Sequence, residues 1–316
     1  MSLPAGYTWR AMRLEDAGLI AARSAEHTSA LLGFAKHSAE DVANYLRDPG
    51  TNLTTDSWLV SGPHNFAGSA TAVPITAGSH VVVDILSPDP AILHWLLEKA
   101  EARAAGAERA VGGWGVVVRV GVVRQDELLG GVLAARGYVV GTSVQRMRIA
   151  FDGAVPAVDV PEGIVVRRGA LNEASRRAAH AVLMEAFAEQ PGTLPRPYEE
   201  WVASRESRST FDWPQVTIVE RAGQAVGMTE CNDNVVSTDN CGYVGRLDVV
   251  PSARGRGLAK YLLRNAFAVD SAAGRSGTIL HVDTNNPTPA LALYTAVGMR
   301  PDLISDIWTR CSCRQA

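Results

Sequence analysis

The sequence lacks several features that would assign it to a large class of proteins. No apolar run approaches the roughly 20 residues that cross a bilayer, and residues 1–6 carry no basic segment followed by an apolar core. Lys and Arg form no cluster longer than a scattered pair, and the formal net charge is -3. We therefore expect a soluble, cytoplasmic protein with neither a membrane nor a nucleic acid as partner.

Cysteine is also scarce. The four cysteines, Cys231, Cys241, Cys311 and Cys313, all fall in the second half of the chain. So few in a chain of this size do not make a disulfide framework, and their spacing relative to His281 matches no zinc pattern. We expect no metal.

The composition predicts a chain that is globular throughout and has two domains. Hydrophobic residues make up 47% and charged residues 20% of the 316 residues, without the bias of a disordered segment. Domains commonly have roughly 100–200 residues, so this length favours two. Two stretches, Gly6-Tyr-Thr-Trp-Arg-Ala and Gly163-Ile-Val-Val-Arg-Arg, begin alike, which indicates an internal duplication.

Both halves then repeat one order of elements: a strand, helices, an apolar hairpin, a strand, a long helix, a strand and a short helix. This order predicts an α/β fold of the α+β type, in which each half forms a mostly antiparallel mixed sheet flanked by helices. Residues 151–163 are rich in Pro and Gly and read as a linker. The predicted domains are therefore 1–156 and 157–316.

The most informative stretch of the sequence is residues 247–260. A strand is followed by a loop with Gly255 and Gly257 that leads directly into an amphipathic helix. A helix N-terminus presents unpaired N–H groups and partial positive charge, and glycine lets a phosphate approach the backbone. Arg254 and Arg256 add positive charge. The loop therefore predicts a phosphate site, although it matches neither the phosphate loop of nucleotide hydrolases nor the dinucleotide fingerprint.

Two motifs of this half resemble those of one family. Arg254-Gly-Arg-Gly-Leu-Ala259 resembles the R/Q-x-x-G-x-G/A motif of the GNAT superfamily of acyl-CoA N-acyltransferases. Residues 286–299 resemble its second motif, in which an Asn precedes a helix that carries a Tyr four residues before a Gly. Because both motifs occur in the family's order, we identify residues 157–316 as a GNAT-like domain with an intact acetyl-CoA motif.

The resemblance implies how acetyl-CoA would bind as a co-substrate. The pyrophosphate would lie on the loop amides, and the pantetheine arm would follow residues 247–249 like an added strand, where the family's strand splays from its neighbour at a bulge. The amide of Val249 would then donate to the thioester carbonyl. The implied cofactor-binding residues are Leu247, Asp248, Val249, Arg254, Gly255, Arg256, Gly257, Leu258, Ala259, Lys260 and Asn286.

The resemblance assigns one catalytic residue and leaves another open. Tyr294 would protonate the departing thiolate, although it could equally pack in the core. Many relatives carry a Glu early in the strand that precedes the loop, and this chain has none there. Asp248, Glu230 and Asp283 are the alternatives for the general base, each acting through water.

The first half departs from the family pattern. Residues 81–95 run from a strand into a helix without a glycine or an arginine, and Leu133 stands where the tyrosine is expected, four residues before Gly137. We interpret this half as a degenerate GNAT-like domain that supports the second. Backbone contacts need no particular side chain, so cofactor binding there stays open.

The pairing of two such halves resembles the arrangement of mycothiol synthase and its relatives. It implies direct transfer of acetyl from acetyl-CoA to a primary amine of a small molecule: a metabolite, an antibiotic intermediate or a mycothiol-type precursor. Loops including residues 190–198 would line the acceptor site, and the protein would be a monomer or a homodimer. Cys231 and Cys241 lie in neither motif, so no acyl-enzyme is expected.

Two other functions are weighed against this one. The missing strand Glu is compatible with a CoA-binding regulatory or scaffold protein that has lost catalysis, whereas Tyr294 argues for an enzyme. Aminoacyl-tRNA-dependent transferases also pair two GNAT-like halves. The intact loop and the acidic balance of charge argue against that alternative.

Overall fold

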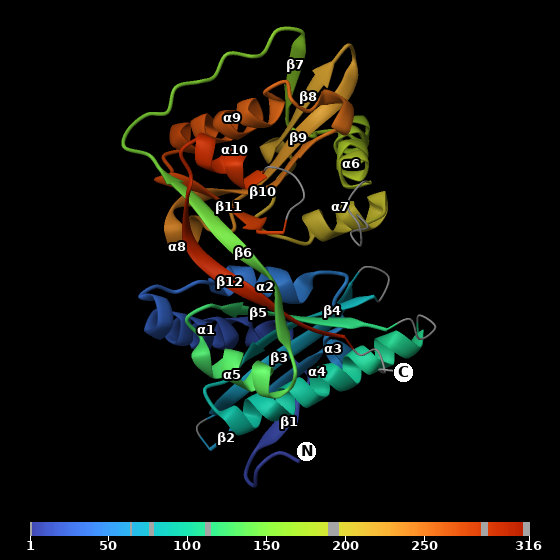
Figure 1. The fold of residues 1–316 in the computed structure, drawn as a ribbon, viewed down its shortest axis with the longest axis vertical. Helices are drawn as coiled ribbons and strands as arrows, with labels where there is room; N and C mark the ends of the chain where they lie inside the picture. The colour runs from blue at the N-terminus through green and yellow to red at the C-terminus, as the bar shows by residue number, and fades with distance from the viewer. Residues whose placement is uncertain are drawn as a thin grey trace. The chain divides into compact units, whose positions relative to one another are not determined.

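The computed structural model describes residues 2–63, 65–75, 79–110, 115–188, 196–285 and 290–311. They form two compact units (Figure 1). Unit 1 contains residues 1–144 and 304–316, and unit 2 contains residues 145–303. Among the described residues, no helix is both long enough and apolar enough to span a membrane.

The first half of the chain follows the predicted order of elements. Its strands are β1 (Thr8–Arg10), β2 (Ser57–Gly62), β3 (Asn65–Ile75), β4 (His80–Leu86) and β5 (Val117–Val123), followed by β6 (Val139–Ala150). Its helices are η1 (Leu14–Asp16), α1 (Ala17–Leu32), α2 (Ala39–Arg47), α3 (Leu53–Asp56), α4 (Pro90–Ala110) and α5 (Glu127–Ala135).

The second half of the chain repeats this order, so the predicted duplication of a mixed α/β fold is confirmed. Its strands are β7 (Ile164–Arg168), β8 (Val216–Arg221), β9 (Gln224–Asn232), β10 (Cys241–Val249) and β11 (Gly277–Asp283), followed by β12 (Arg300–Cys311). Its helices are α6 (Glu173–Phe187), α7 (Tyr198–Glu206), η3 (Trp213–Gln215), α8 (Val236–Asp239), η4 (Pro251–Ala253), α9 (Leu258–Ala272) and α10 (Ala290–Ala296).

The division into units differs from the predicted boundary at residue 157 because the two halves exchange their last strands. β12, the last strand of the second half, pairs antiparallel with β5 over Ser305–Cys311. β6, the last strand of the first half, is the hydrogen-bonded neighbour of β11. The chain is therefore cut at residues 144 and 303, and the predicted linker falls inside unit 2. As a boundary between the two sequence repeats, residue 157 stays a prediction.

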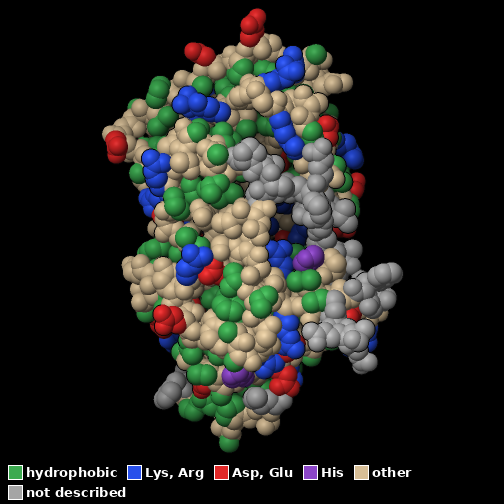
Figure 2. All heavy atoms as spheres, viewed as in Figure 1, with side chains coloured by type: hydrophobic (Ala, Val, Ile, Leu, Met, Phe, Trp, Pro, Cys, Tyr) green, Lys and Arg blue, Asp and Glu red, His purple; other side chains and the backbone are tan. Residues whose placement is uncertain are grey.

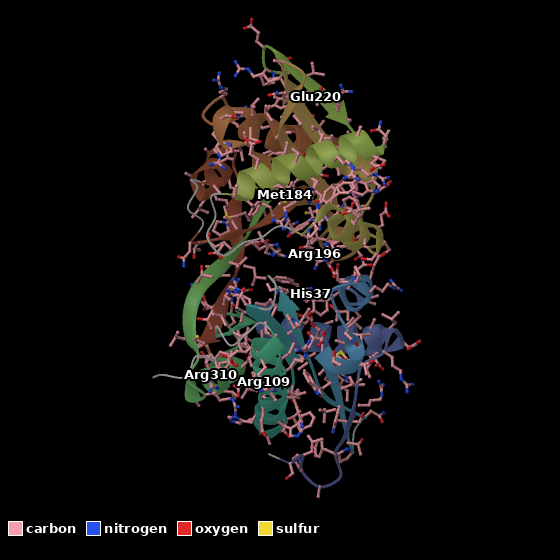
Figure 3. The ribbon with its side chains drawn as sticks, turned by 90° about the vertical axis from the view of Figure 1, so that its right-hand side faces the viewer. His37, Arg109, Met184, Arg196, Glu220 and Arg310 are labelled. Carbon is pink, nitrogen blue, oxygen red and sulfur yellow. The ribbon has the colours of Figure 1, made fainter. Side chains whose placement is uncertain are left out.

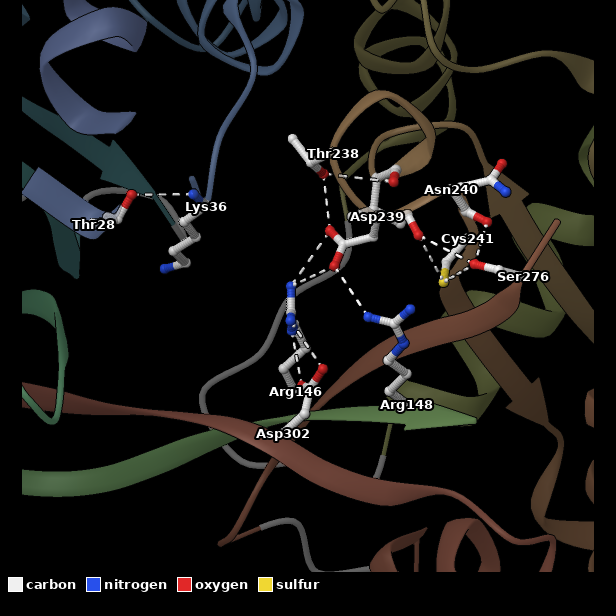
Figure 4. A network of polar contacts seen from close by, with 11 residues as sticks. Thr28, Lys36, Arg146, Arg148, Thr238, Asp239, Asn240, Cys241, Ser276 and Asp302 are labelled. Atoms are coloured by element: carbon white, nitrogen blue, oxygen red, sulfur yellow. Dashed lines mark hydrogen bonds and ion pairs between the residues drawn. The ribbon is translucent and has the colours of Figure 1, made fainter. Parts of the chain in front are cut away.

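A charged network holds β6 within unit 2 (Figure 4). Arg146 is buried and donates through Nε and Nη2 to the carboxylate of Asp302, at 2.8 and 2.9 Å. It also contacts Asp239, to which Arg148 is paired at 3.5 Å. A buried guanidinium requires such partners, because removing one would leave a charge uncompensated.

The sheet of unit 2 is covered by helices on both faces. Ile218 packs with Trp201 and Trp213 in the cluster below α6 and α7, whereas its neighbour Val219 packs with Tyr261 and Leu262 of α9. Consecutive strand residues face opposite sides of a sheet, so α9 lies on one face and α6 with α7 on the other. The faces are called the α9 side and the α7 side below.

The surface carries both signs of charge. On the face seen in Figure 2, the coloured basic and acidic side chains are interspersed over the described residues. This pattern agrees with the small net charge of the sequence.

Candidate functional site

A bulge in β10 brings side chains from non-alternating positions onto the same face. The register between β10 and β9 shifts between Val244 and Arg246. Val244 and Leu247, three residues apart, consequently both contact the core on the α9 side. Tyr243 and Arg246 both line a pocket on the α7 side. Regular alternation would put each of these pairs on opposite faces, and the extra residue of a bulge reverses that.

Next to the bulge, β10 separates from its parallel neighbour β11. Pairing between the two strands runs from Cys241–Gly277 to Val244–Leu280 and ends there, although β10 continues to Val249 and β11 to Asp283. The remaining parts of both strands lie within the described residues. A wedge therefore opens between β10 and β11, beginning at the bulge.

The exposed edge of β10 offers backbone donors to this wedge. The amide of Val250 donates to the carbonyl of Val226 on β9 at 3.0 Å. In an antiparallel pair, such hydrogen-bonded positions alternate with positions whose amides point outward. With the constant register from Arg246 to Val249, the amides of Leu247 and Val249 point away from β9, toward the side where β11 has separated.

The loop after β10 leads into helix α9, whose N-terminus has no side-chain cap. Gly255 and Gly257 have φ angles of +75° and +77°, a region that L-residues rarely adopt. Gly257 is the N-cap residue of α9, so no side chain accepts from the first amides of this helix. These amides and the partial positive charge of the helix end remain available to an anion.

Arginine stabilises the loop and adds charge to it. Arg254 donates through Nε to the carbonyl of Val249 at 3.2 Å and through Nη2 to that of Ala186 at 3.3 Å. It therefore ties the loop to the ends of β10 and α6. Arg256 and Lys260 are exposed beside the helix N-terminus.

Tyr294 lies on α10 and packs against the α9-side core that contains Val244 and Leu280. Both alternatives weighed for this residue, packing and proton donation, are therefore compatible with its position. The pKa of the Tyr294 hydroxyl is raised to about 12. Burial is the larger cause, and the nearby charge of Asp248 is the smaller one. The hydroxyl is thus protonated at neutral pH and can donate a proton.

Asp248 is a buried carboxylate with an unusual environment. Only 7% of the residue is exposed, and its Oδ2 atom has no hydrogen-bond partner among the described residues. Burial raises the pKa of Asp248 to about 6, and the largest opposing effect is the nearby charge of Arg246. A carboxylate that titrates near neutral pH and has an unpaired oxygen can accept a proton.

Glu230, the second candidate base, is held in an ion pair. It is 3% exposed, and both of its carboxylate oxygens accept from Nε of Arg205, at 3.0 and 3.2 Å. Burial lowers the pKa of Arg205. Glu230 lies directly opposite Arg246 in the β9–β10 register, so it is positioned beside the bulge.

A polar pocket of about 280 Å³ opens on the α7 side of the bulge. Arg196, labelled in Figure 3, lies two residues before α7. The lining residues come from α7 and the segments flanking it, from β9 and the loop after it, and from β10: Arg196, Ser204, Arg205, Arg208, Glu230, Asn232, Asn234, Tyr243, Gly245 and Arg246. The sequence analysis did not predict the arginines that line this pocket, because they are scattered along the chain and form no motif.

Some predicted positions lie apart from this site or outside the described residues. Asn286 and residues 190–195 of the predicted acceptor loop belong to the parts not described. Asp283, the third candidate base, accepts from the amide of Asn285 at 2.8 Å. Asp283 lies at the end of β11, which is the strand across the wedge from β10.

Cys231 and Cys241 are unsuited to carry an acyl group. Burial raises the pKa of the Cys231 thiol and of the Cys241 thiol. A thiol with a raised pKa is rarely the thiolate that acts as a nucleophile. Among the described residues, no group of three His, Cys, Asp or Glu side chains could hold a metal ion.

Unit 1 shares the strand separation, since the pairing of β4 with β5 ends at Val83–Val120 before either strand ends, but its described residues lack the bulge and the free helix end. The register between β3 and β4 runs from Ser69–Leu86 to Ile75–His80 without a shift. At the start of α4, the Asp89 carboxylate accepts from the amide of Ala91 at 2.8 Å. This helix end therefore already holds a negative charge, which opposes phosphate binding. Leu133, at the position of the second half's tyrosine, is fully buried.

Comparisons with known proteins agree with this geometry. Residues 178–299 match the family model described as Acetyltransferase (GNAT) family, and all of them lie in unit 2. No curated protein matches the sequence.

Solved structures match the whole chain. A GCN5-related N-acetyltransferase from Sphaerobacter thermophilus has a TM-score of 0.82 and 24% identity, and covers 100% of this chain and 98% of its own. A tandem GNAT protein from the clavulanic acid biosynthesis pathway has a TM-score of 0.70 and 16% identity, with 98% and 100% covered. The N-myristoyltransferase of Saccharomyces cerevisiae, solved with myristoyl-CoA, has a TM-score of 0.60 and 11% identity, with 98% and 79% covered. At these identities the likeness concerns the fold.

Proposed function

We propose that this chain, a tandem-domain protein of the GNAT superfamily, is an N-acetyltransferase that moves acetyl from acetyl-CoA directly to a primary amine of a small molecule. The observation that carries the proposal is the wedge between β10 and β11, which begins at the bulge and leads to an uncapped helix N-terminus. An acyl-CoA has the matching order of groups: a thioester, an extended amide-containing arm and a pyrophosphate.

Unit 2 would bind acetyl-CoA along this track. The outward amides of Leu247 and Val249 would pair with the pantetheine arm and the thioester carbonyl, as an added strand would. The first amides of α9, with Arg256 and Lys260, would hold the pyrophosphate. Arg254 would act indirectly, because its guanidinium fixes the loop. Asn286, outside the described residues, stays a prediction.

The proposed reaction forms one C–N bond and breaks one C–S bond. The neutral amine attacks the thioester carbon, and the Val249 amide stabilises the negative charge that develops on oxygen. Asp248 takes the proton that the amine loses, through water, and Tyr294 donates a proton to the departing CoA thiolate. We prefer Asp248 to Glu230 as the base because its Oδ2 is unpaired, whereas both oxygens of Glu230 accept from Arg205.

The first test is calorimetry of acetyl-CoA with the intact protein and with an Arg256→Glu, Gly257→Glu double variant. We expect one binding site per chain, abolished in the variant, because carboxylates at a helix N-terminus repel a pyrophosphate. A matched control, Arg221→Glu at the exposed end of β8, should bind normally. Binding that survives the double variant would assign the cofactor to unit 1.

The second test is release of CoA with a panel of small amines. Turnover with at least one amine supports the enzyme. Acetyl-CoA binding without turnover of any amine would instead favour the alternative of a CoA-binding regulatory or scaffold protein. We further propose that the protein acts in the cytoplasm as a monomer or a homodimer, and that its partners are acetyl-CoA and a small acceptor.

A further inference from the structure

A pocket of about 270 Å³ lies in unit 1, among residues that the proposed reaction does not use. Its walls are the end of β5, the N-terminal half of α5 and part of β12, elements that Figure 1 labels. All of its described lining residues belong to unit 1. They are Val122, Val123, Arg124, Asp126, Glu127, Gly130, Gly131, Asp306 and Trp308.

Two adjacent glycines of α5, Gly130 and Gly131, border this pocket. Glycine inside a helix lowers helix stability relative to alanine. Among the described residues, a Cβ on Gly131 would meet nothing within 4 Å, and a Cβ on Gly130 would meet the Trp308 ring at an ordinary contact distance of 3.6 Å. Crowding within the chain therefore does not require glycine here. The two glycines leave the α5 side of the pocket open, which suits a bound molecule.

The charged side chains of this pocket have partners, with one exception. Asp306 accepts from Nη2 and Nε of Arg124, at 2.6 and 3.1 Å. Asp126 caps α5 through one oxygen, and its other oxygen lies 2.7 Å from Nε2 of His27. The carboxylate of Glu127 has neither a hydrogen bond nor an ion pair with any described residue. The pocket therefore keeps one negative charge that the chain does not pair.

Trp308 gives the same pocket an aromatic wall. It is two residues from Asp306 on β12, so both side chains lie on one face of that strand. The Trp308 ring is partly buried against the core of unit 1, which restricts its orientation. Among aromatic rings, indole attracts a cation most strongly. An unpaired carboxylate and an indole in one pocket favour a cation that also has an apolar part.

We propose that this pocket binds a small organic ammonium ion, whose charge pairs with Glu127 and whose apolar part packs against Trp308. The proposal does not depend on acetyl transfer, because its residues are distinct from those of the cofactor track. The volume is near the lower end of the roughly 300–1,000 Å³ typical of ligand pockets, so the ligand should be compact. The unpaired carboxylate would repel an anion.

The test follows Trp308 itself. Protein labelled with fluorotryptophan gives a fluorine NMR resonance for each of its seven tryptophans, and the resonance missing from a Trp308→Phe variant belongs to Trp308. Butylammonium and benzylammonium chlorides are titrated against this resonance. Butanol and benzyl alcohol are the neutral counterparts, and sodium chloride controls for ionic strength. The probe lies in unit 1, so it separates this pocket from an amine site in unit 2.

We expect a saturable shift of the Trp308 resonance with both ammonium ions, and Kd values at least about tenfold lower than those of the alcohols, as a charge-assisted contact gives. Glu127→Gln should abolish that preference. Glu15→Gln, which changes another exposed carboxylate of unit 1, is the matched control and should preserve it. Gly130→Leu should prevent binding by filling the pocket, and unchanged resonances of the other tryptophans would show that this variant folds.

The inference would be overturned by the absence of a saturable Trp308 shift with either ammonium ion. Equal Kd values for the ammonium ions and the alcohols would also overturn it, as would wild-type binding by Glu127→Gln. None of these results bears on the proposed function, which the acetyl-CoA titration and the amine panel test separately.

Discussion

Asp248 is a buried carboxylate whose ionisation opposes folding at neutral pH. Its pKa is about 6 in the folded protein and 3.8 in a solvated chain, so the folded state holds the proton more tightly. The contribution of Asp248 to the free energy of unfolding is therefore largest below about pH 4, and it decreases as the pH rises through 6. At neutral pH the charged carboxylate costs on the order of 3 kcal/mol.

The first prediction follows for Asp248→Asn. At pH 7.5 this variant should unfold with a free energy on the order of 1–3 kcal/mol higher than the wild type, because the buried charge is gone. The gain should vanish near pH 4. The same variant should remove the acid limb of kcat/KM, which we expect near pH 6 in the wild type. Urea unfolding at several pH values and a pH profile measure both effects.

Glu230→Gln is the matched control for that prediction. It leaves Arg205 without its buried partner, so it should destabilise the protein by about 3–5 kcal/mol. The acid limb should persist in whatever activity remains. Loss of the limb in Glu230→Gln, with the limb retained in Asp248→Asn, would make Glu230 the base.

Tyr294 provides the second prediction at this scale. Tyr294→Phe keeps the ring that packs against the core and removes the proton donor. We expect kcat to fall about 10²- to 10⁴-fold, the usual contribution of general acid catalysis, with no change in acetyl-CoA affinity. Steady-state kinetics and calorimetry test this, and an unchanged kcat would reduce Tyr294 to a packing residue.

The loop between β10 and α9 is the element on which cofactor binding depends. Its two glycines adopt positive φ, although a Cβ at either would meet nothing within 4 Å. Alanine at these positions is therefore disfavoured by the backbone conformation and not by crowding. Alanine at either glycine should therefore change the backbone conformation of the loop without producing a steric clash.

The third prediction concerns Gly257→Ala. We expect acetyl-CoA affinity to fall about five- to thirtyfold, because a cost of roughly 1–2 kcal/mol for an L-residue in this region shifts the loop from its binding conformation. Gly131→Ala is the control, since Gly131 lies in helix α5 with open space around it and its φ is not positive. Equal affinities of the two variants would show that the loop conformation is not required.

At the scale of the whole molecule, the exchange of β6 and β12 makes each compact unit depend on chain from both halves. The hydrogen-bonded edge of β11 is covered by β6, and that of β5 by β12. An uncovered strand edge exposes unpaired backbone groups and promotes aggregation. We therefore expect neither half of the sequence to fold stably without the last strand of the other half.

The fourth prediction compares two fragments. Residues 139–316, which retain β6, should unfold more cooperatively and stay monomeric at higher concentration than residues 157–316, which lack it. Thermal unfolding and sedimentation measure the difference. Equal behaviour of the two fragments would mean that β6 contributes nothing to unit 2.

The sequence by itself determined the features that are local along the chain. The loop at residues 254–260 was predicted correctly as a glycine-containing entry to a helix, because positive φ and a helix N-terminus depend on a few adjacent residues. The predicted order of strands and helices was also confirmed. It depends on the spacing of apolar residues within each short segment, which is visible in the sequence.

Only the tertiary structure decided what depends on pairing between distant segments. The bulge at residues 244–246 exists relative to β9, and Arg205 meets Glu230 through packing of α7 on the sheet. The strand exchange is likewise invisible in the sequence, because β6 and β12 stand in equivalent places in the two repeats and either could complete either sheet. Pairing energies between remote strands make that choice, and they are set by contacts in space and not by order along the chain.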